Sequence, residues 1–410
     1  MRGAGDQFSI GERIAFYRRR RGMTQVVLAG LVGRTEDWLS KIERGDREIR
    51  RLDILAEVGQ ALRVTMGDLL GQPVLVEDER NQDDDVPAIR DALMTPQRLS
   101  RVLFGPNESV PMAAGPIERL AELAWGDFQR GRIGSVITAL PSLITSVQQL
   151  EDAVVHLTSA RATWGASARI HHLAASTLAK VGESDLAWIA AERAMQAADQ
   201  SDDPKALASA ARAGTHALLA LGRYDDALSL GATASAWLQD RVAANDREAL
   251  SLSGMLSLRT AVAAARRQDR GTRTDLLRLA ARAAEQLGED ANYWQTGFGP
   301  TNVKLHELST ALDLGDVAYV VEHGSRISTE NMPVERAVAH RMDVARAMSL
   351  VAQDDEALRY LLDAEHEAPQ TVRHSVAVRE TVRTMYRRAP VTARKASPLL
   401  GLAERCRAVG

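Results

Sequence analysis

The stretch Thr24–Gly45 limits the fold of this chain more than any other part of it. Thr24 and Thr35 are residues of the kind that cap helix starts, and Gly33 lies between them. Threonine accepts a hydrogen bond from a free backbone N–H, and glycine adopts the left-handed conformation that other residues avoid. The pattern therefore predicts two short helices joined by a tight turn, the layout of a helix-turn-helix whose second helix enters a DNA major groove. The apolar residues expected on the inner faces are Leu28, Ala29, Val32, Leu39 and Ile42.

The flanking sequence extends this stretch into a complete small domain. Ser9 can cap a helix over Ile10–Arg21, and apolar positions mark two further helices around Leu52–Leu62 and Val64–Leu70. Five helices in about 70 residues can close one small core. The segments IGERIAFYRRRRGMTQ, LAGLVG, WLSKIERGDR and LAEVGQALRVTMGDLLG resemble the Xre (lambda-repressor-like) helix-turn-helix domain. The resemblance implies an all-α domain over residues 1–71 that binds double-stranded operator DNA, usually as a homodimer.

The resemblance also indicates which side chains would contact DNA. Gln25 resembles the family's glutamine that clamps phosphate and base, and Glu36, Asp37 and Ser40 fall where its base-reading side chains sit. The two acids leave two interpretations open. They favour the positive N-terminal end of the helix dipole, or one of them accepts a hydrogen bond from cytosine N4. The other candidates for DNA contact are Arg18, Arg34, Thr35, Lys41 and Arg44.

Charge and composition agree with a DNA-contacting head on a mildly acidic body. Between Arg13 and Arg51 there are eleven Lys/Arg and five Asp/Glu, although the whole chain has a net charge of −3. Cys406 is the only cysteine, which excludes an intrachain disulfide and favours a cytoplasmic location. No apolar run approaches the roughly 18 residues of a membrane span, so no membrane association is expected.

The rest of the chain divides into a linker and a long helical part. Residues 72–111 are rich in Asp, Glu and Pro and predict a loosely packed linker with short helices at Ala88–Met94 and Gln97–Phe104. Residues 112–410 read as helices of 12–20 residues separated by short turns. The turns recur at Gly131, Gly182, Gly222 and Gly315, with a less regular one near Asp269–Thr272, and small residues follow at Ala187, Ala227 and Ala357.

These segments, with ALGRYDDAL the best match, resemble tetratricopeptide repeats. The resemblance implies helix pairs that stack into an α-solenoid, with the first helix of each pair lining the concave face. The expected pairs span residues 115–150, 153–200, 204–241, 246–288, 300–328, 333–367 and 370–408.

Polar side chains at helical spacing predict where an effector would bind on that concave face. Asn302 and His306 lie four residues apart, as do Arg336 and His340, and an aromatic segment around Trp294 precedes them. Asn and Arg suit the amides and carboxylates of a peptide or small molecule. The alternative is that these side chains bond locally and fill an irregular repeat. Asp343 completes this set, and Trp164, Arg169 and His172 form a second, weaker one.

No enzyme, metal or cofactor motif accompanies these features. Glu365-His366-Glu367 lacks the second histidine of a zinc helix, and no Gly-rich phosphate loop with Lys-Ser/Thr is present. The layout is similar to the peptide-responsive quorum-sensing regulators of the RRNPP group. Three hypotheses stay open: a dimeric regulator that senses a peptide or small molecule, a DNA-binding protein with a ligand-free docking scaffold, and an adaptor that does not use DNA.

Overall fold

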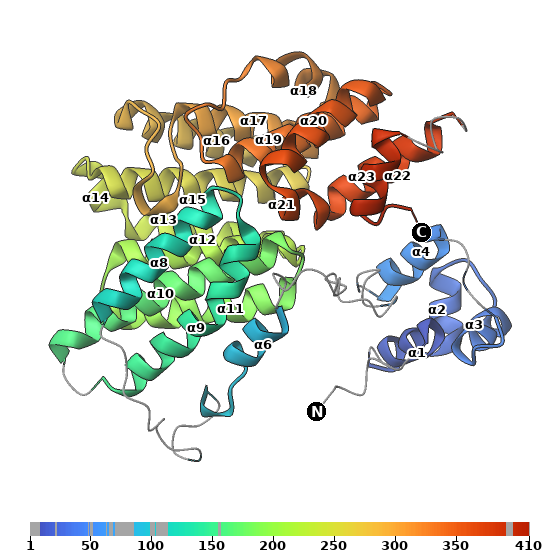
Figure 1. The fold of residues 1–410 in the computed structure, drawn as a ribbon, viewed down its shortest axis with the longest axis horizontal. Helices are drawn as coiled ribbons and strands as arrows, with labels where there is room; N and C mark the ends of the chain where they lie inside the picture. The colour runs from blue at the N-terminus through green and yellow to red at the C-terminus, as the bar shows by residue number, and fades with distance from the viewer. Residues whose placement is uncertain are drawn as a thin grey trace. The chain divides into compact units, whose positions relative to one another are not determined.

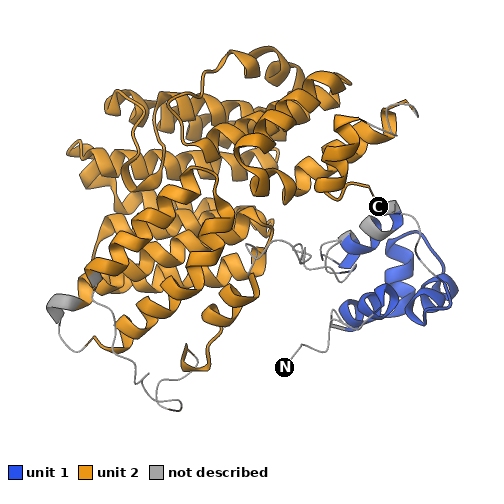
Figure 2. Ribbon diagram, viewed as in Figure 1, with its two compact units in different colours: residues 1–80 blue, residues 81–410 orange. Residues whose placement is uncertain are grey.

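The computed structural model divides the chain into two compact units, residues 1–80 and residues 81–410 (Figure 2). The structure describes residues 9–20, 23–47, 49, 52–62, 64, 69, 86–98, 103, 114–154, 157–390 and 397–409. Among these the named elements are all helical, and one isolated bridge pairs Ala291 with Phe298. Of the predicted fifth helix of unit 1, only Val64 and Leu69 are described, and most of the predicted linker lies outside the described residues.

Unit 1 contains α1 (Ile10–Arg20), α2 (Gln25–Leu31), α3 (Glu36–Glu43) and α4 (Leu52–Leu62). Gly11 allows α1 to cross α3 closely, because a Cβ there would lie 1.9 Å from the carbonyl oxygen of Ile42. All the residues predicted to face inward in α2 and α3 are buried in one apolar cluster. That cluster comprises Ile14, Leu28, Ala29, Val32, Leu39, Ile42, Val58, Leu62 and Leu69.

Unit 2 begins with α6 (Val86–Leu93) and the 3₁₀ turn η1 (Pro96–Arg98), and then continues as a series of helix pairs (Figure 1). The pairs are α8 (Ala114–Gln129) with α9 (Ile133–Asp152), α10 (Leu157–Lys180) with α11 (Ser184–Ser201), α12 (Pro204–Ala220) with α13 (Tyr224–Trp237), α15 (Arg247–Arg266) with α16 (Arg270–Leu287), α17 (Pro300–Asp313) with α18 (Val317–His323), α19 (Val334–Leu350) with α20 (Asp354–Glu367), and α22 (Val376–Arg388) with α23 (Pro398–Arg405). Shorter elements are α14 (Gln239–Ala243), η2 (Tyr293–Gln295), η3 (Gly324–Arg326) and α21 (Pro369–Arg373). Each observed pair coincides with one predicted from the sequence.

The same turn joins the two helices in six of these pairs. In each, a left-handed residue lies two positions before the second helix: Gly131, Gly182, Gly222, Gln268, Gly315 and Ala352, with φ between 61° and 86°. The following residue donates its N–H to a carbonyl five residues back, as from Arg132 to Asp127 and from Asp269 to Ala264. This is the Schellman pattern, which satisfies carbonyls left free at a helix end. The four turn glycines predicted from the sequence are confirmed, and Gln268 and Ala352 adopt the same conformation despite their side chains.

From the pair α10–α11 to the pair α19–α20, the first helix of each pair is buried more completely than the second. Fifteen residues of α15 are buried, whereas four residues of α16 are. Alanine and glycine on the inner helices permit this close packing. A Cβ on Gly254 of α15 would lie 2.0 Å from the ring of Phe298, which is fully buried. The inner helices α8, α10, α12, α15, α17 and α19 are therefore the ones that can surround an interior site.

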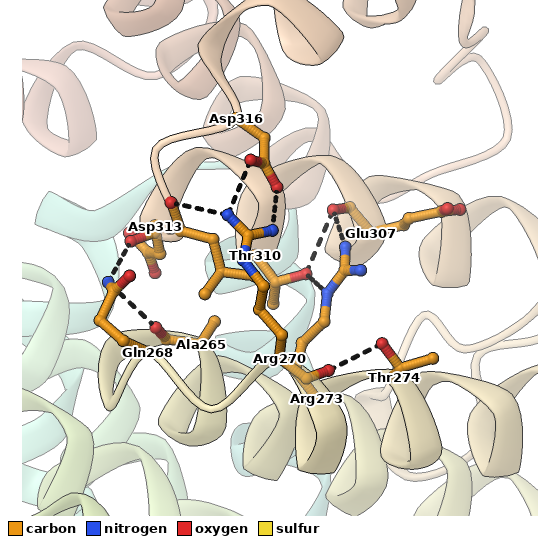
Figure 3. A network of polar contacts seen from close by, with 10 residues as sticks. Ala265, Gln268, Arg270, Arg273, Thr274, Glu307, Thr310, Asp313 and Asp316 are labelled. Atoms are coloured by element: carbon orange, nitrogen blue, oxygen red, sulfur yellow. Dashed lines mark hydrogen bonds and ion pairs between the residues drawn. The ribbon is translucent and has the colours of Figure 1, made fainter.

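Arginines at the turns connect one pair to the next. Arg270 at the start of α16 makes a bidentate ion pair with Asp316 in the α17–α18 turn, at 2.6 and 2.8 Å (Figure 3). Arg273, one turn further on, donates to the hydroxyl of Thr310 at 2.9 Å (Figure 3). Gln268 donates to the carbonyl oxygen of Asp313 at 3.0 Å. These contacts fix the angle between two consecutive pairs.

The series of pairs also closes on itself. The first pair contacts later elements, since α8 packs against α19 and α9 packs against α21. Lys180 at the end of α10 forms an ion pair with Glu335 at the start of α19. Residues 289–299, called the strap below, reach back to α8, where Asn292 and Gln129 exchange two amide hydrogen bonds of 2.9 Å. The interior of unit 2 is thus enclosed, whereas the sequence predicted an open concave groove.

The second half of the predicted linker belongs to unit 2. α6 buries Val86, Ile89, Ala92 and Leu93 and packs against α9 and α11. Beyond it, Arg98 forms an ion pair with Glu151 at 2.6 Å. The expectation of a loosely packed linker from 72 to 111 is therefore wrong for residues 86–98, where the apolar face of a short helix completes the core.

α9 is long and apolar enough to cross a membrane, with 20 residues and a mean hydropathy of 1.2, and among the described residues it is the one helix that passes this test. Its apolar side chains, including Ile133, Ile137 and Ile144, are buried against neighbouring helices. Glu151 near its end pairs with Arg98 inside the unit. These are the surroundings of a core helix.

Candidate nucleic-acid interface and interior cavity

Two threonines and one glycine build the turn between α2 and α3. Thr24 caps α2 by accepting from the N–H of Val27 at 3.3 Å, and Thr35 caps α3 by accepting from the N–H of Trp38 at 3.2 Å. Gly33 has φ 61°, the left-handed conformation that the turn requires. A third cap starts α1, where Ser9 and Glu12 exchange backbone-to-side-chain hydrogen bonds of 2.7 and 3.3 Å in a capping box. The caps and the turn predicted from the sequence are confirmed.

A buried carboxylate ties the first three helices together. Glu43, at the end of α3, accepts from Nε and Nη2 of Arg18 in α1 at 2.6 and 2.7 Å. It also accepts from the amide of Gln25, the first residue of α2, at 2.7 Å. Only 8 % of Arg18 and 8 % of Glu43 is exposed, and the hydrogen bond with Glu43 raises the pKa of Arg18. The expectation that Arg18 contacts phosphate does not fit this burial, because its guanidinium is used inside the unit.

The outward face of α3 carries the remaining candidates. Glu36, Asp37, Lys41 and Arg44 are exposed, and Ser40 is partly exposed. Lys41 pairs with Asp37 one turn away at 2.7 Å, an exposed contact that a phosphate can replace at little cost. Arg34 and Thr35, just before the helix, are also exposed. A capped helix thus presents acids, a hydroxyl and cations to solvent, while Leu39 and Ile42 on its other face are buried.

The comparison with protein families decides what this arrangement is. Residues 9–70 match the family described as a helix-turn-helix domain. Unit 1 is a helix-turn-helix domain. This domain indicates DNA binding and transcription regulation for the protein. No curated protein and no solved structure matched the chain.

In unit 2 of this helix-turn-helix protein, most candidate effector residues are buried and bonded. His306 bonds to the carbonyl of Asn302 in its own helix at 3.0 Å, and His340 bonds to the carbonyl of Gly324 at 3.0 Å. Both are at most 5 % exposed, so neither presents a free face to a groove. Trp294, in the strap, donates to Glu248 at 3.1 Å. The His306 bond is the local bonding that the sequence left open as the alternative, whereas His340 and Trp294 bond to more distant segments of unit 2.

Two candidates do reach a common interior space. Asn302 and Arg336 line a cavity enclosed by α8, α10, α12, α15, α17, α19 and the strap. His172, from the weaker set, lines the same cavity from α10. Asp343 lies near Arg336, and burial raises its pKa. Arg169 instead pairs with Glu122 at the strap, and Trp164 packs against an apolar cluster nearby. Residues far apart in sequence therefore meet at one place.

Four further basic residues of this cavity escaped the sequence analysis: Lys180, Arg212, His216 and Arg259. Lys180 follows His172 by eight positions, and His216 follows Arg212 by four, so each pair lies on one helical face. The signal was present as polar residues at helical spacing inside alanine-rich helices. It was missed because such residues also occur on solvated faces, and only the packing of α10, α12 and α15 turns these faces inward.

Proposed function

We propose that this protein is a sequence-specific transcription regulator of the Xre type, whose unit 2 mediates homodimerisation and senses a small effector. The observation that carries the DNA-binding part is the capped helix α3, which presents Ser40, Lys41 and Arg44 to solvent inside a matched helix-turn-helix domain. The recurrent turn geometry supports a tetratricopeptide-like repeat for unit 2. The single cysteine, Cys406, is free and buried, which fits a cytoplasmic location.

Base recognition and phosphate contact are separable by mutation. Ser40→Ala is expected to relax the preference at one or two base pairs, at a cost of about 1 kcal/mol. Lys41→Ala is expected to weaken binding to all sequences and to lower the slope of log affinity against log salt by about one. Arg278→Ala, an exposed arginine on α16 of unit 2, is the matched control and is expected to change neither quantity.

The measurement is fluorescence anisotropy with the full chain, using DNA sites selected from a random pool and a series of salt concentrations. A wild-type affinity that does not depend on salt, or a Lys41→Ala variant with an unchanged slope, would show that α3 does not approach the phosphate backbone.

A further inference from the structure

The interior cavity of unit 2 carries an excess of positive charge. Four cationic side chains line it, and they face one carboxylate, Glu335, among the lining residues. Burial lowers the pKa of Arg212 to about 9 and that of Arg259 to about 10, yet both values leave the guanidinium charged near neutral pH. The four cations are Lys180, Arg212, Arg259 and Arg336.

The nearby carboxylates do not satisfy these cations. Asp343 lies near Arg336 but outside the cavity lining, and burial raises its pKa. Glu335 is already paired with Lys180. Nε and Nη2 of Arg336 and Nε of Arg259 are buried and have no hydrogen-bond partner among the described residues. A buried charged donor without an acceptor is costly, and charge-assisted bonds to an oxyanion are the strong way to satisfy it. The cavity therefore contains several unpaired donors that a negatively charged acceptor would satisfy.

The neighbouring neutral groups refine the chemistry of that acceptor. Burial lowers the pKa of His172 and of His216 well below the ordinary value, so both imidazoles are neutral and add no charge to balance. The side-chain oxygen of Asn302 is buried without a partner, although its amide nitrogen donates to the carbonyl of Gly297 at 2.8 Å. A ligand that also carries an O–H, such as hydrogen phosphate or a hydroxy acid, can donate to that oxygen.

The size of the cavity limits the ligand. Its volume is about 50 Å³, which is room for about four water molecules. That space suits one phosphate group or a short hydroxycarboxylate. An extended peptide, which the sequence suggested as one kind of effector, does not fit the enclosed form.

We propose that this cavity binds a small oxyanion that also carries a hydroxyl, either hydrogen phosphate or a short hydroxycarboxylate. The inference deepens the proposed effector role of unit 2 and rests on it. Arg336 and Arg259 supply unpaired donors, and Arg212 adds a third guanidinium. Arg212 also donates to the carbonyl of Trp294 at 3.2 Å, so the ligand site and the strap share a side chain.

The test is isothermal titration calorimetry of the full chain with two probes, inorganic phosphate and glycolate, against sodium chloride of equal ionic strength. Arg336→Met and Arg259→Met each remove a donor of the cavity. Arg278→Met removes an exposed arginine that pairs with Asp275 on α16, and it is the matched control. Wild type and Arg278→Met are expected to show saturable binding of at least one probe. Each cavity variant is expected to bind about 10- to 100-fold more weakly.

Thermal unfolding of the same proteins separates a binding role from a structural one. Without an anion, Arg336→Met is expected to unfold at the same or a higher temperature than wild type, because it removes a buried guanidinium with two donors that lack an acceptor. Arg336→Lys keeps the charge but loses the planar fork, and it is expected to bind with intermediate affinity. The probe that binds tells phosphate and hydroxycarboxylate apart.

Absence of saturable heat with both probes would overturn the proposal, as would equal affinity in wild type and in both cavity variants. These outcomes are independent of DNA. If the chain binds anions as expected but shows no salt-dependent affinity for DNA, the proposed regulatory function fails while the anion site stands.

Discussion

The substitution Glu43→Gln tests how much the buried ion pair of Arg18 and Glu43 stabilises unit 1. The carboxylate accepts three charge-assisted or amide hydrogen bonds at 2.6–2.7 Å from Arg18 and Gln25, and its side chain is 4 % exposed. Glutamine keeps the shape but removes the charge, so the buried guanidinium loses its counter-ion. Breaking a buried pair from one side costs about 3–5 kcal/mol. A unit of about 70 residues has a total stability of roughly 4–10 kcal/mol, so this substitution should remove about a third of it or more.

Hydrogen exchange read by mass spectrometry on the full chain measures this loss locally. Amides in the middle of α1 and α3 are expected to exchange roughly 10²- to 10³-fold faster, while those of α15 in unit 2 stay unchanged. The double variant Arg18→Met/Glu43→Leu replaces the pair by apolar groups and is expected to recover much of the protection. Asp37→Asn breaks an exposed pair instead and should cost less than about 1 kcal/mol. Protection in Glu43→Gln that matches Asp37→Asn would refute the reasoning.

Three further outcomes follow from packing, titration and assembly. In urea titrations, Gly11→Ala is expected to destabilise unit 1 by about 1–3 kcal/mol, because its Cβ would lie 1.9 Å from the carbonyl oxygen of Ile42. Gly30→Ala has open space around it and should stabilise α2 by up to about 1 kcal/mol. Burial lowers the pKa of His340 to about 4, so the unfolded chain binds more protons than the folded chain between pH 6.5 and 4. The free energy of unfolding is therefore highest above this window and falls as the pH drops through it. In urea titrations at each pH, His340→Gln should remove on the order of 3 kcal/mol of this pH dependence. In sedimentation equilibrium at micromolar concentration, residues 81–410 are expected to be dimeric, and a monomer would contradict homodimerisation through unit 2.

Features set by local physics could be predicted from the sequence. Thr24 and Thr35 cap their helices and Gly33 turns left-handed because each effect depends only on the adjacent backbone. The turns of unit 2 follow the same rule. Features set by distant partners could not be predicted. Arg18 looked like an exposed cation in an arginine run, and only the approach of Glu43, 25 residues later, places it in the interior.

The candidate site shows the same division. Helical spacing singled out Asn302 with His306 and Arg336 with His340. Of these, Asn302 and Arg336 do line the cavity, because helical periodicity fixes which face of a helix a side chain lies on. The closure of the series decides what that face meets. Packing of α12 on α15 brings Arg212 and Arg259 together, and contact of α19 with α8 adds Arg336 to the same space. Local spacing contains no information about which helices, more than a hundred residues apart, become neighbours.

Closure also explains why a small anion would act on the whole of unit 2. A series of helix pairs that touch only their neighbours bends easily, but here the first and sixth pairs are in contact and the Lys180–Glu335 ion pair joins the second pair to the sixth. Four cations facing one another oppose that closure, and an anion among them replaces repulsion by attraction. A ligand shifts the balance only by its differential affinity for the closed form. An uncharged molecule of the same size should therefore leave hydrogen exchange at α8 and α19 unchanged, whereas the anion should slow it.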